Sequence, residues 1–500
     1  MTTIQPHLAA NPLVLSIDVG TSSARALLYD SLGRMVLGTE GRTAYQMVTT
    51  PDGGVEMDPD LLLQSVLSVI DAVASAAGDL PGKVCSVAMC TFWHSVMGVD
   101  LNGRPVTPLY NWSDTRSRED ARELGRRIGT ARIHSTTGTM PHSSYYPAKI
   151  LWLRRTRPDL YWRVERWVSF GEYFYWHLFR RWRCSVSIAS GTGLFNPNTC
   201  EWARDMLDAV GIDDRKLSPL AQQGESLAVL AGEYAARWPE LSAVPWIPAY
   251  GDGASSNIGS GCVTEDLVAI NLGTSGAMRI CWRADHVNIP PGLWCYRADS
   301  RYFVMGGALS NGGDVYAWCQ KVLRVEPGDL DEQKLARMPA DGHGLTVLPF
   351  YSGERSTGWS DDARASLVGM TTSTSPIDIL RANLEAVAYR FAAIYDLLEQ
   401  EVPGEKQIVA SGGAFSICPA WIQILADVLG VPVIASPAPE ASSRGAAISA
   451  LEALGYIPDL GAIPAPLGRI HEPDRANYER YVAARHRQQE LYDRLLGQRT

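Results

Sequence analysis

The chain has 500 residues, 45 basic and 54 acidic, and its net charge of −9 argues against a dedicated nucleic-acid binder. Apolar residues make up 46% and charged residues 20%, as in a globular protein with large cores. The length fits about two to four domains.

The N-terminus shows no positive segment followed by an apolar core, so no secretory signal is expected. No apolar stretch approaches the length that spans a bilayer. The nine scattered cysteines form no C-x-x-C pair, which favours free thiols in a reducing compartment. We therefore expect a soluble cytoplasmic protein without a membrane or nucleic-acid partner.

The first strong pattern is a strand–turn–strand unit at residues 13–29. An apolar strand leads to Asp18, and the turn Gly20-Thr21-Ser22 offers backbone N–H groups and hydroxyls to an anion. A carboxylate at position 18 would repel a phosphate unless a cation lay between them. The unit therefore predicts a metal–nucleotide site.

A helix with one apolar face is predicted at residues 58–77, and a buried strand, a break and a second strand at 84–100. The break carries Trp93 and His94. A lone histidine among apolar residues is more often a packed core residue than a ligand. However, the end of a strand is also where open α/β sheets bind ligands.

Asp114 and Arg116 follow a Trp residue in the segment that comes next. Asp114 can cap a helix while Arg116 lies on the surface, or the two can bind a polyhydroxylated ligand; the sequence leaves both open. Residues 154–183 are rich in Trp, Tyr and Arg. The acidic net charge and the helical spacing favour packing over nucleic-acid stacking, so we interpret this stretch as scaffold and a candidate homodimer surface.

A change in character near Pro248 predicts two domains, residues 1–247 and 248–500. Asp252 is the only residue that is charged at neutral pH in the run 250–261 that follows. It either caps a helix of small residues or presents a carboxylate that takes a proton from an attacking hydroxyl, and both can hold at once.

The opening unit recurs about half a chain length later. Residues 17–24 align with 270–277, sharing Ile, Gly, Thr, Ser and Ala, and Asp18 falls on Asn271. Two such turns can close on one phosphate chain from both sides. Only the first copy offers a carboxylate to a cation.

The remaining second half predicts strands and helices joined by glycine-rich turns. We expect a strand ending before a turn at 305–313, a helix at 315–322, a strand at 345–350, a helix at 380–401, a strand at 407–410 and a helix at 419–429.

The chain resembles the FGGY carbohydrate kinases of the actin/hexokinase/Hsp70-type ATPase superfamily. The resemblance covers residues 13 to about 452 and is carried by SIDVGTSSARALLYD, YGDGASSNIGSGC, NLGTSGAMR, LPFYSGERSTGWSDDARASLVGM, ASGGAFSICPAWIQILADVLGVPV and PEASSRGAAISAL. It implies an α/β fold of two ribonuclease-H-like domains around a central cleft. It also implies phosphorylation of a sugar or polyol hydroxyl with ATP and Mg²⁺.

By the family pattern, Asp252 looks like the catalytic base and Asp18 like the group that helps to hold Mg²⁺. The resemblance assigns contacts with ATP to Gly20, Thr21, Ser22, Gly273, Thr274, Gly313, Gly412 and Gly413. Trp93-His94 stands where the family often has Met-His contacting substrate, and Asp114 stands in the family's W-A-D-x-R segment.

The sequences GDGASSN, S-G-E-R-S-x-G-W and G-G-A-x-x-x-x-P-A-W are most similar to the gluconokinase-like branch. We therefore expect conversion of gluconate to 6-phosphogluconate, with Arg116 as the candidate partner of the carboxylate. A ketopentose kinase acting on xylulose or ribulose is the alternative within the class. An ATPase switch without a small acceptor is the alternative outside it, and the polar residues expected around Asp252 favour the kinase.

Overall fold

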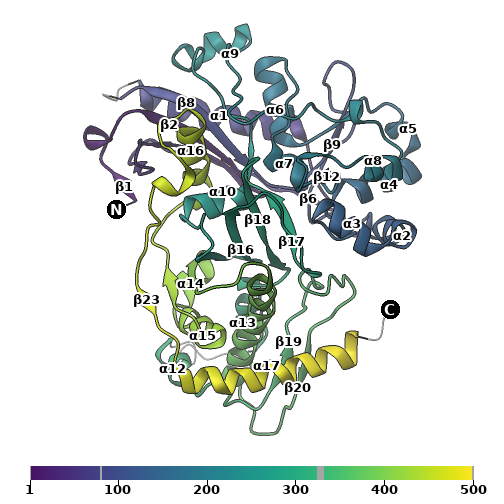
Figure 1. Cartoon of the computed structure of the whole chain (residues 1–500), viewed down its shortest axis with the longest axis vertical. Coiled ribbons are helices and arrows are strands. Elements are labelled where there is room, and N and C mark those ends of the chain that lie inside the picture. The colour runs from purple at the N-terminus through teal and green to yellow at the C-terminus, as the bar shows by residue number, and fades with distance from the viewer. Residues whose placement is uncertain (1, 79–81, 324–331, 498–500) are drawn as a thin grey trace.

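The computed structural model describes residues 2–78, 82–323 and 332–497. Two lobes are each built around a seven-stranded mixed sheet, with the first sheet in the upper part of Figure 1 and the second below it. This two-lobed α/β architecture is the one that the resemblance implied.

The first sheet has the order β1-β4-β3-β2-β8-β14, with β5 paired to β3. Its strands are β1 (Thr3–Ile4), β2 (Leu13–Val19), β3 (Ser23–Tyr29), β4 (Met35–Val36), β5 (Gly41–Ala44), β8 (Val84–Thr91) and β14 (Tyr250–Gly251). All seven residues of β2 are buried, so the centre of the sheet is covered on both faces. Helix α1 (Pro59–Ala77) packs against β3 and β5, and α16 (Ala441–Ala453) packs against β2 and β8.

The second sheet has the order β17-β18-β16-β15-β21-β22-β23. Its strands are β15 (Leu267–Leu272), β16 (Gly276–Arg283), β17 (Trp294–Arg297), β18 (Tyr302–Leu309), β21 (Gln407–Ser411), β22 (Val433–Ala435) and β23 (Ile470–His471). Helices α13 (Pro376–Glu401), α15 (Ala420–Leu429) and α17 (Arg475–Leu496) form the helical layer of this lobe (Figure 1).

The remaining elements flank the two sheets. They are β6 (Val48–Thr49), β7 (Val55–Met57), β9 (Met97–Val99), β10 (Leu109–Tyr110), β12 (Phe195–Asn196), β13 (Glu201–Trp202), β19 (Thr346–Leu348), β20 (Ser366–Val368), α2 (Arg118–Ile128), α3 (Thr130–Thr137), α7 (Val186–Ser190), α8 (Arg204–Val210), α9 (Gly232–Arg237), α11 (Gly313–Val322), α12 (Glu332–Arg337) and α14 (Gly413–Ile417).

The two sheets use equivalent hairpins at their centres. Strand β2 pairs antiparallel with β3 and parallel with β8, and β15 pairs in the same way with β16 and β21. The register sets Asp18 opposite Cys90 and Asn271 opposite Ser411. This equivalence supports the internal repeat expected from the sequence.

Helices α10 (Asp252–Gly259) and α16 lie together between the lobes. A Cβ added to Gly259 would lie 1.8 Å from the Ala441 carbonyl oxygen, and one added to Gly445 would lie 1.8 Å from that of Ser255. The two helices therefore pack backbone to backbone. Apolar residues of both helices belong to the core of the first lobe, and the division at residue 247 stays a prediction.

Helix α1 begins and ends where the sequence predicted, with Asp58 as N-cap and Pro59 as the first helical residue. By length and composition alone it is apolar enough to cross a membrane, so the expectation that no stretch reaches that length is wrong. In the structure, one face of α1 is buried against β3 and β5, as in the core helix of a globular lobe.

The aromatic and basic stretch at 154–183 does not form one helix. It comprises the end of α4 (Tyr146–Thr156), α5 (Pro158–Tyr161), β11 (Arg166–Val168) and α6 (Phe170–Phe179). Pro158 cannot continue α4, and Ser169 and Glu172 form a capping box that starts α6. The use of this stretch as a homodimer surface stays a prediction.

The glycines at 306 and 307 lie within β18, whereas we expected a turn there. A Cβ on Gly306 would lie 2.1 Å from the Met278 carbonyl oxygen, and one on Gly307 would lie 2.6 Å from Ile394. These glycines therefore allow close packing against β16 and α13, and the turn comes only before α11 at Gly313.

A buried carboxylate ties α13 to α17. Glu385 accepts hydrogen bonds from Arg381 (2.6 Å), Tyr481 (2.8 Å), His343 (3.0 Å) and Tyr389 (3.1 Å). Burial alone would raise the pKa of Glu385, but the His343 hydrogen bond and the Arg381 charge hold it below its usual value.

Candidate active site

Asp18 lies near the end of β2 with its carboxylate buried. Cys90 Sγ donates to Oδ1 at 3.3 Å, and Arg25 Nη1 lies 3.6 Å from Oδ2 while also pairing with Glu440. Burial raises the pKa of Asp18 and the Arg25 charge opposes this. A cation beside this carboxylate would favour its ionised form.

The turn after Asp18 is held by backbone contacts and leaves its hydroxyls free. The Gly20 N–H donates to the Ser23 carbonyl (3.0 Å), and the Tyr45 hydroxyl donates to the Gly20 carbonyl (2.6 Å). Thr21 and Ser22 are exposed. Their N–H and hydroxyl groups are thus available to an anion.

The second turn meets two further glycine-rich turns. The Gly313 N–H donates to the Gly273 carbonyl (2.7 Å), and the Gly312 N–H donates to that of Thr274 (3.0 Å). Gly412 has a φ of 114°, and a Cβ there would lie 2.3 Å from the Leu272 carbonyl oxygen. The structure therefore brings Gly273, Thr274, Gly313 and Gly412 together.

Gly413 and Asn271 lie beside the second turn. Gly413, the exposed first residue of α14, has no atom within 4 Å of an added Cβ. Asn271 donates to Ser411 Oγ (3.2 Å), which is the position that Cys90 holds beside Asp18 in the first sheet. The second turn thus has an amide where the first has a carboxylate.

Asp252 is the first residue of α10, and the residue before it, Gly251, is the N-cap. Asp252 therefore does not cap the helix, which was one of the two roles that the sequence allowed. The Gly253 N–H donates to Asp252 Oδ1 at 2.8 Å. Burial raises the pKa of Asp252 to about 6; the Arg279 charge opposes the shift and the Asp18 charge adds to it. The carboxylate is mostly ionised at neutral pH and can still accept a proton.

Trp93 supports the turn that carries Asp252. A Cβ on Gly251 would lie 2.0 Å from the indole Nε1, and one on Gly253 would lie 2.5 Å from Cζ3. The indole N–H donates to the Ser187 carbonyl (2.9 Å), while the Ser187 hydroxyl accepts from the Gly251 N–H (3.0 Å). The glycines around Asp252 thus make room for this ring.

His94 is held in one tautomer with a left-handed backbone, φ 66°. A carbonyl only accepts, so Nδ1 donates to the Gly191 oxygen at 2.5 Å and Nε2 is left as an acceptor. Burial lowers the pKa of His94 to about 3, so the ring is neutral. It packs against Tyr145 and Tyr296, whose hydroxyls are 2.6 Å apart and join the two lobes.

Arg116, which is partly exposed, pairs with the buried carboxylate of Asp114. Arg116 Nη2 lies 2.5 Å from Asp114 and 2.6 Å from Glu56, and its guanidinium lies 4.7 Å from the Trp152 ring. Burial opposes the charge, but the two carboxylates raise the pKa of Arg116. Asp114 does not cap α2, because Ser117 is the N-cap. Arg116 is neutralised before any substrate arrives.

Sequence reasoning missed two arginines that enter the site. Arg279 lies on β16 beside Gly253, and Arg355 lies in the loop between β19 and β20 with its guanidinium 5.2 Å from the Trp112 ring. Both occur in the segments NLGTSGAMR and LPFYSGERSTGW that carry the resemblance. These segments are the signal that could have found the two arginines, but the proximity of Arg279 to Asp252 depends on the fold.

Contacts between the lobes were also missed. His142 Nδ1 accepts from the Ser144 N–H (3.2 Å), so Nε2 donates to Asp361 across the lobes at 3.0 Å. Arg122 pairs with Asp362 at 2.8 Å. The two contacts join residues more than 200 positions apart in the sequence.

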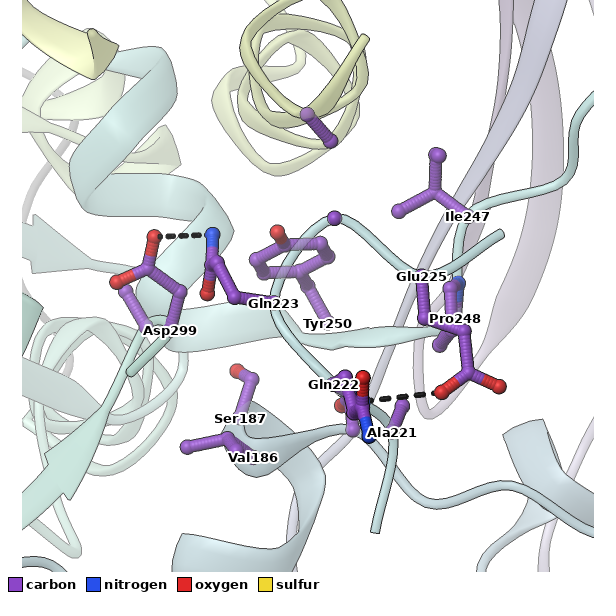
Figure 2. A pocket seen from close by; sticks show the side chains of 14 residues that line it. Val186, Ser187, Ala221, Gln222, Gln223, Glu225, Ile247, Pro248, Tyr250 and Asp299 are labelled. Atoms are coloured by element: carbon purple, nitrogen blue, oxygen red, sulfur yellow. Dashed lines mark hydrogen bonds between the residues drawn. The ribbon is translucent and has the colours of Figure 1, made fainter. Parts of the chain in front are cut away.

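Figure 2 shows a pocket of about 40 Å³ beside β14. Gln223 donates to Asp299 at 3.1 Å at one side, and Tyr250 and Ser187 also line the pocket. It has room for a few water molecules and not for a sugar. Asp252 does not line it, so this pocket is distinct from the candidate active site.

Comparisons with known proteins agree with this geometry. The chain matches the model of the FGGY carbohydrate kinase N-terminal domain over residues 13–259 and that of the C-terminal domain over residues 268–454. It is 27% identical to the gluconokinase of Bacillus subtilis over 470 residues, covering 92% of this chain and 91% of that protein.

Two solved structures share the fold over almost the whole chain. The gluconate kinase from Lactobacillus acidophilus has a TM-score of 0.90 and 26% identity, with 97% of this chain and 98% of that chain covered. A ligand-bound xylulose kinase from the same organism has a TM-score of 0.91 and 25% identity, with 97% and 99% covered. The chain belongs to the FGGY family of carbohydrate kinases.

Proposed function

We propose that this protein transfers the γ-phosphoryl group of ATP to a hydroxyl of a small sugar acid, with gluconate as acceptor and 6-phosphogluconate as product. The observation that carries this proposal is Asp252, whose raised pKa of about 6 suits a base that works near neutral pH. Trp93, the neighbour of His94 in the sequence, packs against the turn of Asp252, and the Asp18 charge acts on its carboxylate.

In this reaction, Asp252 accepts the proton of the acceptor hydroxyl as that oxygen attacks the γ-phosphorus. The bond to the β–γ bridging oxygen breaks and ADP leaves. Phosphoryl transfer depends mainly on positioning and on neutralising charge. The exposed N–H and hydroxyl groups of Thr21 and Ser22 in the first turn and of Thr274 in the second suit contacts with the phosphates from two sides. Gly20 and Gly273 use their own N–H groups to close these turns, and their lack of a side chain suits a close approach by the phosphates.

The nucleotide would extend from these turns towards the other glycine-rich turns. Gly313 begins α11 against the second turn, and Gly412 and Gly413 begin α14. The absence of side chains there suits a backbone approach by adenosine.

Asp18 fits the role of holding Mg²⁺, because a buried carboxylate beside exposed hydroxyls is the oxygen donor set that this ion prefers. When bound, Mg²⁺ supplies neutralisation of the phosphate charges. Arg25 lies 3.6 Å from Asp18 and keeps the carboxylate partly balanced.

On the acceptor side, the neutral Nε2 of His94 suits a hydrogen bond from a sugar hydroxyl. Asp114, held by Arg116 and the Val55 N–H, suits another. Trp93 positions the turn of Asp252. The similarity to the gluconokinase of Bacillus subtilis favours gluconate.

The similarity to a xylulose kinase structure keeps a ketopentose kinase as the second candidate. An ATPase switch is disfavoured, because it has no use for a buried carboxylate whose pKa is raised to about 6. We place the reaction in the cytoplasm, since all nine cysteines are free thiols.

The test is ADP release by the wild-type protein with Mg²⁺–ATP and one acceptor at a time: gluconate, xylulose, ribulose or glycerol. We expect a strong dependence on gluconate. Equal rates with and without every acceptor would support the ATPase switch. A preference for xylulose or ribulose would show that the acceptor is a ketopentose and not gluconate.

A further inference from the structure

Arg279, beside Asp252, and Arg355, whose charge acts on Arg279, lack a polar partner in the described part of the chain. The guanidiniums of Arg279 and Arg355 form no hydrogen bond and no ion pair within residues 2–78, 82–323 and 332–497. Nε and Nη1 of Arg279 and Nε of Arg355 are buried. A buried N–H group without a partner is costly, and a charged one more so, so this place is suited to an anionic ligand.

Arg279 projects from β16 onto the first turn of α10. A Cβ added to Gly253 would lie 3.1 Å from Arg279 Nε, and Asn257 fixes the strand by donating to the Arg279 carbonyl at 3.2 Å. Its charge acts on Asp252, yet the two form no ion pair. The guanidinium therefore lies beside the base and remains available to a ligand.

Arg355 reaches the same place from the second lobe and stacks on Trp112 of the first. The adjacent carboxylate of Glu354 does not neutralise it, because Glu354 is held by Arg390 (2.7 Å) and Tyr492 (2.8 Å). Arg355 thus carries an unbalanced charge at the junction of the two lobes.

Arg279 and Arg355 lie near the residues that we propose to bind the phosphate acceptor. The Arg355 charge is among those that influence His94, Tyr145 and Tyr296, and it also acts on Arg279. The hairpin of Asp18, in contrast, has its own cation in Arg25.

Resting on the function proposed above, we propose that Arg279 and Arg355 bind the carboxylate of the acceptor and make the enzyme selective for aldonates. Each guanidinium can donate two parallel hydrogen bonds to a carboxylate, a geometry that a neutral sugar does not satisfy. Arg116, which the sequence suggested for this role, is already paired with Asp114 and Glu56. The acceptor would lie with its carboxylate at the two arginines and a hydroxyl at Asp252.

The experiment measures binding of D-gluconate and of its neutral analogue D-gluconamide by calorimetry without nucleotide, and then KM and kcat with Mg²⁺–ATP. The variants are Arg279→Gln and Arg355→Gln. The matched control is Arg283→Gln, on the same strand but exposed and stacked on Tyr302.

We expect each Gln variant to weaken gluconate binding about 10- to 100-fold, the usual effect of losing a hydrogen bond to a charged group. Gluconamide binding and the KM for ATP should not change, and Arg283→Gln should match the wild type. The wild type itself should prefer gluconate over gluconamide, a comparison that needs no variant. Arg279→Lys and Arg355→Lys keep the charge and replace any Gln variant that does not fold.

Gluconate binding within twofold of the wild type in both Gln variants would overturn the inference. So would equal binding of gluconate and gluconamide by the wild type, or a loss of affinity for ATP alone, which would assign the arginines to the phosphates. Phosphorylation of gluconate without dependence on these arginines leaves the proposed function intact. Arginine-dependent binding without phosphorylation refutes the function and supports the carboxylate site.

Discussion

Replacing Asp252 by Asn should remove most of the turnover and at the same time stabilise the fold at neutral pH. Asn is nearly isosteric but cannot accept the proton of the acceptor hydroxyl. Loss of general-base catalysis usually costs about 10²–10⁴ in rate, so we expect kcat to fall by this factor while ATP still binds.

The stability effect follows from the raised pKa. Burial moves the pKa of Asp252 from 3.8 to about 6, so the folded state binds this proton more tightly than the unfolded state does. The ionised carboxylate therefore lowers the free energy of unfolding above pH 6, and this cost fades as the pH falls towards 4. The full shift corresponds to about 3 kcal/mol; because water reaches part of the group, we expect Asp252→Asn to gain about 1–2 kcal/mol at pH 7.

The same pKa sets the pH dependence of catalysis. A carboxyl group of pKa about 6 is ionised in about 90% of molecules at pH 7 and in about 10% at pH 5. Hence kcat/KM of the wild type should fall about tenfold between pH 7 and pH 5. Direct measurement of ADP by chromatography avoids coupling enzymes that are themselves sensitive to pH.

Asp71→Asn is the control, since Asp71 lies on α1 and its partly exposed carboxylate pairs with Arg237 at 2.6 Å. Hydrogen bonding by Arg237 lowers the pKa of Asp71, so this variant should lose stability at pH 7 and keep its kcat. Turnover of Asp252→Asn within tenfold of the wild type, or a loss of stability like that of Asp71→Asn, would refute the reasoning.

Asp18→Asn should lower kcat about 10²-fold and raise the Mg²⁺ concentration needed for half-maximal rate, with gluconate binding unchanged by calorimetry. Gly251→Ala should lose about 1–3 kcal/mol in urea unfolding and most of its turnover, because the new Cβ would lie 2.0 Å from Trp93. Glu385→Ala should lose about 3–5 kcal/mol in urea unfolding, because Arg381 would remain buried without its carboxylate.

Each of these predictions has a simple check. For Asp18→Asn, an unchanged Mg²⁺ requirement would contradict the metal role. Gly232→Ala on α9 has no atom within 4 Å of the new Cβ, so it should be tolerated, and Gly251→Ala must differ from it. Glu479→Ala removes an exposed pair with Arg475 on α17 and should change stability by less than about 1 kcal/mol; equal effects at 385 and 479 would exclude the buried network.

The sequence predicted the features that depend on local order. The hairpin of Asp18 and its second copy at Asn271 each pair two strands that follow one another in the sequence, so the sequence pattern alone was enough to predict them. The helix of Asp252 was also predicted, but its N-cap is Gly251, and the Asp252 carboxylate accepts from the Gly253 N–H without capping the helix.

The features that sequence reasoning could not supply depend on distant contacts. Arg116 was a reasonable partner for a carboxylate until the fold placed Glu56 beside it, 60 residues away in sequence. Arg279 became a candidate binding residue only when the fold placed it beside Gly253 without a hydrogen-bond partner. No periodicity in the sequence reports which charges the fold leaves unpaired.

The position of α16 has a consequence for synthesis of the chain. Ala446, Ala447, Ile448, Ala450 and Leu451 belong to the core of the first lobe, although they come near the end of the sequence. While ribosomes add residues at about 5–20 per second, the first sheet must wait for some tens of seconds with its α16 face uncovered. The first lobe is therefore begun first and completed last, and during that interval β2 and β8 are natural targets for a chaperone.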